Sequence, residues 1–114
     1  MLGTKEKGIM LNIISHCERI EEKLFDISKQ DFDKSKDIQE IFCFNIFQIG
    51  ELAKNLSTEF IHQFNGMPWR QIKGMRDKIG HGYGTVKMND VWDTAIEDIK
   101  PLKDYCQQII NDNK

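Results

Sequence analysis

The chain has 114 residues, of which 39% are hydrophobic and 30% are charged, and its formal net charge is −2 at pH 7. This length and composition are typical of one globular domain, so we expect a single domain over residues 1–114. The small negative charge argues against a surface that coats nucleic acid in general, so any contact with RNA has to be local.

The three cysteines, Cys17, Cys43 and Cys106, lie far apart and form neither a C-x-x-C pair nor a Cys/His spacing suited to zinc. An odd number of cysteines without a signal peptide predicts free thiols in a reducing compartment. No apolar run approaches the roughly 20 residues of a membrane span. We therefore expect a cytoplasmic protein without membrane association, metal site or cofactor.

The first predicted helix starts after Thr4 and runs to about Phe25. Its apolar residues recur in alternating steps of three and four, which indicates one buried face. These residues are Met10, Ile13, Cys17, Ile20, Leu24 and Ile27. The polar segment from Ser28 to Lys36 predicts a loop, with candidate helix caps at Asp31, Asp33 and Ser35.

The second predicted helix runs from about Ser35 to Leu56. Asn45 takes a position that the pattern assigns to an apolar residue, and a buried amide needs hydrogen-bond partners. It is either a core amide that fixes the helix register or a group that braces an active site. Gly50 costs about 1 kcal/mol relative to alanine in mid-helix, and its small size allows a neighbouring helix to approach closely. Residues 57–64 predict a further helical turn or two.

The third helix follows the break at residues 65–68 and ends near Gly80. Its buried stripe comprises Trp69, Ile72, Met75 and Ile79. A last helix, capped by Asn89 or Asp90, contains Pro101, which predicts a kink. No segment alternates with period two for long enough to form a strand. The expected fold is all-α, an up-and-down bundle of four main helices plus a short extra helix.

Residues 75–86 concentrate the groups that can move protons or hold a phosphate. Arg76 offers planar donors to phosphate oxygens, and His81 can transfer a proton near neutral pH. Gly80 and Gly82 let the helix end and allow His81 and Tyr83 to turn back towards Arg76. Cleavage of RNA without a metal needs proton transfer and stabilisation of charge on the phosphorus oxygens, so these residues are candidate catalytic groups.

Each chain supplies one such histidine, whereas acid and base steps are easier with two. A two-fold homodimer with both copies of the stretch in one cleft would provide them. The mechanism, rather than any interface pattern, therefore predicts the dimer.

Arg70, Lys73 and Lys78 surround Arg76 with positive charge, opposed by one acid, Asp77. This is either a patch that attracts an RNA backbone phosphate or an ordinary solvated helix face. Tyr83 lies between two glycines. Its hydroxyl either contacts RNA or accepts a modification, or its ring packs against the end of the bundle.

The stretch Arg76-Asp77-Lys78-Ile79-Gly80-His81-Gly82-Tyr83 resembles the R-x4-6-H signature of the HEPN superfamily, and in particular the HepT-like toxins, in which a tyrosine follows two residues after the histidine. Other parts of the chain are also similar to that family. They are the helix NIFQIGELAKNL from Asn45, the segment MPWRQIKGMR from Met67, and the Val91-Trp92 and EDIKPL blocks of the last helix. These four ordered blocks cover most of the chain.

This resemblance implies a HEPN-like helical bundle, a homodimer, and a toxic RNA endonuclease with Arg76 and His81 as catalytic residues. It implies a cognate antitoxin, the nucleotidyltransferase MntA, which transfers AMP from ATP to Tyr83 and silences the toxin. It also implies supporting roles for Asn45 and Glu51. Asp77 stands where relatives often carry asparagine, and it could orient His81 or Arg76 or weaken the attraction of RNA.

Two other functions stay open on the residues alone. The chain could be a non-catalytic module that binds a nucleotide or a nucleotidyltransferase without cutting RNA. It could also be a plain structural helical dimer, a reading that requires Arg76, His81 and Tyr83 to lie far from one another.

Overall fold

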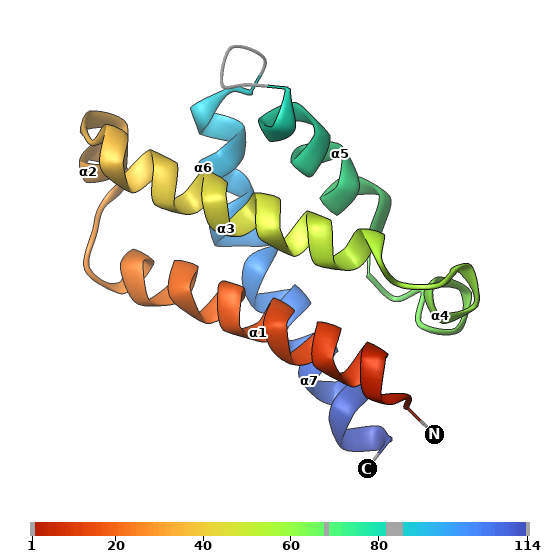
Figure 1. Cartoon of the computed structure of the whole chain (residues 1–114). Coiled ribbons are helices and arrows are strands. Elements are labelled where there is room, and N and C mark those ends of the chain that lie inside the picture. Colours follow the sequence, from red (N-terminus) through yellow and green to blue (C-terminus); the bar gives the residue numbers. More distant parts are fainter. Residues whose placement is uncertain (1, 68, 82–85, 114) are drawn as a thin grey trace.

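The computed structural model describes residues 2–67, 69–81 and 86–113, and these fold as helices without strands (Figure 1). The prediction of an all-α fold is confirmed. The helices are α1 (Thr4–Phe25), α2 (Lys29–Lys34), α3 (Lys36–Lys54), α4 (Thr58–Gln63), α5 (Trp69–Gly80), α6 (Met88–Glu97) and α7 (Ile99–Asp112). Among the described residues, no helix combines the length and the apolarity that crossing a membrane requires.

Helix α3 lies at the centre of the bundle, with α1 packed on one side and α5 on the other, and α7 runs along α1 (Figure 1). The alternating apolar steps of α1 produce this core, because Met10, Ile13, Cys17 and Ile20 are all fully buried. The three cysteines are free and buried, as predicted. Burial raises the pKa of the Cys43 thiol to about 11.

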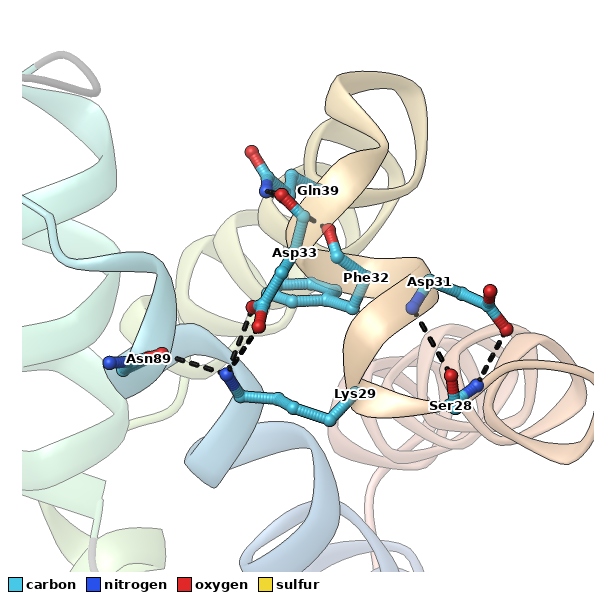
Figure 2. A network of polar contacts seen from close by, with 7 residues as sticks. All are labelled: Ser28, Lys29, Asp31, Phe32, Asp33, Gln39 and Asn89. Carbon is cyan, nitrogen blue, oxygen red and sulfur yellow. Dashed lines mark hydrogen bonds and ion pairs between the residues drawn. The ribbon is translucent and has the colours of Figure 1, made fainter.

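The predicted loop between Ser28 and Lys36 is wrong in part, because it contains helix α2 (Figure 2). The Ser28 hydroxyl accepts the Asp31 N–H at 3.2 Å, and the Asp31 carboxylate accepts the Ser28 N–H at 2.9 Å. This reciprocal capping box starts the helix. Phe32 then anchors it, since its fully buried ring lies 5.2 Å from the ring centroids of both Phe42 and Trp92. A single apolar residue has no periodicity, so the pattern did not predict this helix.

Two expectations about the last helix are also wrong. Helix α6 begins at Met88 with Lys87 at its N-cap, so neither Asn89 nor Asp90 is the cap. The helix does not continue through a kink at Pro101 but breaks at Asp98, between α6 and α7. Proline has no N–H and its ring crowds the carbonyl four residues earlier, which here is Glu97, so the break precedes the proline.

Gly50 brings α3 and α5 into close contact. A Cβ atom at Gly50 would lie 2.3 Å from the Arg76 Cβ, a distance that real side chains essentially never adopt. One turn earlier on α3, the Phe47 ring lies against Gly80, where an added Cβ would be 3.1 Å from it. The two glycines therefore let the backbones of α3 and α5 approach each other beside Arg76.

We expect Gly50→Ala to destabilise the protein by about 1–3 kcal/mol, because overpacking between α3 and α5 outweighs the better helix propensity of alanine. Gly74→Ala is the matched control. It also lies within a helix, but an added Cβ there meets nothing within 4 Å, so it should stabilise by about 0.5–1 kcal/mol. Urea unfolding followed by circular dichroism measures both. Equal effects of the two substitutions would contradict the close approach at Gly50.

Candidate functional site

Arg76 lies on α5 and is held against α3 on several sides. Its Nε and Nη2 atoms pair with the Glu51 carboxylate, and its Nη1 donates to Asp77 Oδ1 at 2.8 Å. The Arg76 Cζ atom lies 5.2 Å from the centroid of the Phe47 ring, a cation–π contact. The guanidinium is thus fixed in orientation while its side chain stays 24% exposed.

These contacts shift the proton affinities of the partners. The hydrogen bond from Arg76 lowers the pKa of the Asp77 carboxyl, and the nearby charges of Arg76, Lys73 and His81 lower it further. The hydrogen bonds with Asp77 and Glu51 raise the pKa of Arg76. At neutral pH one cation therefore faces two carboxylates. A substrate phosphate has to displace one of them to gain the full set of guanidinium donors.

His81 is the first residue after α5. Its backbone N–H donates to the Asp77 carbonyl at 3.1 Å, so the chain still follows the helical path at this residue. Its side chain is exposed, and its charge acts on Asp77. Asp77 is therefore close to both candidate catalytic groups. The expected turn of Tyr83 back towards Arg76 lies outside the described residues.

The structure places the predicted RNA-binding cations on two different faces of α5. Arg70, Lys73 and Asp77 follow one another at steps of three and four and share one face. At 100° per residue, Lys78 is rotated by about 140° from Lys73 and by about 80° from Arg70. It lines another cavity, of about 320 Å³, between α3, α5 and the α6–α7 junction, together with Thr94 and Asp98. Arg70 and Lys73 therefore lie on the same face of α5 as Asp77, and Lys78 does not share this face.

Asn45 forms its hydrogen bonds away from Arg76. Its buried amide Oδ1 lies 2.8 Å from His16 Nδ1 on α1, and its Nδ2 donates to the Ile41 carbonyl at 2.8 Å. These bonds match the interpretation of a core amide that fixes α3 against α1. Glu51, by contrast, contacts the candidate catalytic arginine directly.

Two contributors to the site were not predicted. The ring of Phe47 supports Arg76 and contacts Gly80. Lys54 lines the same groove as Arg70 and Lys73, between the end of α3 and the start of α5. The only available signal was the proximity of both residues to Gly50 in the sequence. In the described part of the chain, no group of three or more His, Cys, Asp or Glu side chains is arranged to hold a metal ion.

With this geometry established, comparison with known proteins identifies the family. Residues 13–109 match the family described as Ribonuclease HepT-like. The chain belongs to the HepT-like family. The family resemblance deduced from the sequence is thereby confirmed.

Individual HepT-like relatives cover nearly the whole chain. A candidate RNase of Caldanaerobacter subterraneus subsp. tengcongensis is 34% identical over 90% of this chain and 92% of its own length. The probable ribonuclease HepT of Thermococcus cleftensis is 36% identical over 90% of this chain and 94% of its own length. A gamma-glutamylcyclotransferase and candidate RNase of Methanocaldococcus jannaschii is 35% identical over 95% of this chain and 49% of its own length. No solved structure gives a significant match.

We expect Arg76→Gln to raise the pKa of the Asp77 carboxyl towards its ordinary value, because Arg76 is the largest cause of its lowering. Since the folded pKa lies below the unfolded one, the stabilisation by this pair is present at neutral pH and is lost as the pH falls through the folded pKa. Carboxyl-detected NMR titration measures the change. Asp31 is the control, because Ser28 lowers its pKa independently of Arg76. An unchanged Asp77 titration would contradict the assigned pairing.

Proposed function

We propose that this HepT-like protein is the toxin of a toxin–antitoxin pair and acts as a cytoplasmic, metal-independent RNA endonuclease. The observation that carries the proposal is the oriented guanidinium of Arg76, which is bound to Asp77, the carboxylate on which the charge of His81 also acts. Two relatives that this chain matches over almost their whole length support the same activity by their names. One is named as an RNase candidate and the other as a probable ribonuclease HepT.

In the proposed reaction His81 transfers a proton at the 2′-hydroxyl or at the leaving oxygen. Arg76 stabilises the negative charge that develops on the phosphorus oxygens. Glu51 and Asp77 hold the guanidinium in position before RNA binds, and the incoming phosphate replaces part of their contacts.

A second chain completes the proposed site. One chain offers one His81, and a two-fold homodimer that joins two such clefts offers one histidine for the acid and one for the base. The exposure of the His81 side chain at the end of α5 leaves it available to such a cleft.

Tyr83 is the proposed point of control. A cognate nucleotidyltransferase of the MntA type transfers AMP from ATP to its hydroxyl. The added phosphate brings negative charge two residues from His81, where the substrate phosphate would bind, so the modified toxin is inactive.

One observation favours a second function. The Arg76 guanidinium is already engaged by two carboxylates of its own chain, an arrangement that also suits a module that binds a nucleotide or a partner without cutting RNA. A purified dimer that binds ATP but leaves RNA intact would support this alternative. Cleavage of RNA by the purified dimer would exclude it.

We expect Arg76→Ala and His81→Ala each to lower the rate of RNA cleavage by at least about 100-fold, the usual loss for a charge-stabilising or proton-transferring group. The assay is cleavage of labelled RNA in EDTA, which also tests metal independence, with the dimer checked by sedimentation. His62→Ala is the matched control, because His62 is an exposed histidine on α4. RNA cleavage by His81→Ala at the wild-type rate would overturn the mechanism.

We expect incubation with the nucleotidyltransferase and ATP to add one or more AMP groups to the wild-type protein and none to Tyr83→Phe. Intact-mass spectrometry provides the measurement, and Tyr105→Phe is the control because Tyr105 is the other tyrosine of the chain. Added mass that persists in Tyr83→Phe would place the modification elsewhere. RNA cleavage should fall in proportion to the modified fraction.

A further inference from the structure

A groove beside the proposed active site gathers positive charge. Its volume is about 420 Å³, and it lies between the end of α3, helix α4 and the start of α5. Three cations from two helices line it, Lys54, Arg70 and Lys73. Its apolar lining includes Leu56, Ile61 and Trp69, and no carboxylate of the described residues takes part in it.

The three cations of this groove form no ion pair. All are exposed, and among the described residues no ion pair joins any of them to a carboxylate. Lys73 acts on Asp77 only by its charge, without an ion pair. In a chain of net charge −2, three unpaired cations around one hollow mark a local anion site.

The groove adjoins the site. Lys73 lines it and also acts on Asp77 by its charge. Lys73 precedes Arg76 by about one helical turn, which is roughly 4.5 Å along the axis. An anionic chain bound to Lys54 and Arg70 could therefore continue along α5, next to Lys73, and reach Arg76.

The lining favours a single-stranded nucleic acid over a free anion. Cations that follow a backbone, combined with an apolar surface for bases, are the usual features of single-strand binding. Here the half-buried Ile61 and the mostly buried Trp69 supply apolar lining. The volume lies in the range of sites that hold one small organic group, roughly 300–1,000 Å³, so it admits a nucleotide rather than a duplex.

We propose that this groove binds the single-stranded RNA segment next to the phosphate that is cut. The inference rests on the proposed ribonuclease function and extends it. It assigns Lys54 a role in RNA binding, and it gives the strand a path from α4 along α5 to Arg76.

The test measures binding of a short single-stranded oligoribonucleotide that is fully 2′-O-methylated and therefore cannot be cut. Fluorescence anisotropy over a range of salt concentrations gives the affinity and its salt slope. Each phosphate contact on a single strand contributes about 0.7 to this slope. The triple variant K54Q/R70Q/K73Q should reduce the slope by about 2 and weaken binding at low salt by at least about tenfold.

The matched control is K23Q/K34Q/K36Q, which removes the same charge. Lys36 begins α3 and Lys54 ends it, so these two lysines lie about 27 Å apart along that helix. The control should leave the salt slope close to that of the wild type. Circular dichroism checks that both variants fold, and R70Q alone, expected to reduce the slope by about 0.7, provides a milder second test.

An unchanged salt slope in K54Q/R70Q/K73Q, or an equal loss in the control variant, would refute the proposal that RNA binds in the groove. Neither result would bear on the proposed nuclease activity, since RNA cleavage by the wild type is measured separately. Conversely, a wild type that cuts no RNA would refute the nuclease, while a reduced slope in the triple variant alone would still support the groove.

Discussion

The close approach of α3 and α5 at Gly50 is the constraint on which the rest of the site depends. Because Gly50 has no side chain, the Arg76 Cβ can lie where any larger residue would collide. The next residue, Glu51, then reaches the guanidinium, and Phe47 lies beneath it. The helix loses about 1 kcal/mol of propensity at this glycine, and two side chains of α3, Glu51 and Phe47, then orient one arginine of α5.

The carboxylates at this contact both orient Arg76 and compete with a phosphate for it. Arg76 is oriented by two carboxylates, and the same carboxylates occupy donors that a phosphate needs. In the proposed nuclease, the attraction of an RNA strand therefore has to come from cations that form no ion pair. Lys54, Arg70 and Lys73 are such cations, and the charge of Lys73 also acts on Asp77. The proposal thus assigns orientation of the arginine and attraction of the strand to separate groups.

Local patterns predicted most of the fold. The three-and-four spacing in α1 predicted four of its buried residues, and glycine and proline at residues 66 and 68 predicted the start of α5. The failures also have local causes. Helix α2 depends on one capping box and one buried ring, Phe32, neither of which is periodic. The break at Asp98 precedes Pro101, because a proline disturbs the turn before it rather than its own position.

For the site, the sequence by itself determined the family and the spacing of Arg76, Asp77 and His81, since these residues are close along one helix. It also indicated that Gly50 permits a close neighbour. Only the tertiary structure decided which neighbour that is. Glu51 and Arg76 are 25 residues apart, and their contact depends on how α3 and α5 are rotated against each other. The separation of Lys78 from Lys73 follows from helix periodicity alone. The grouping of Lys54 with Arg70 and Lys73 depends on that rotation, which the packing of buried side chains sets and no local pattern encodes.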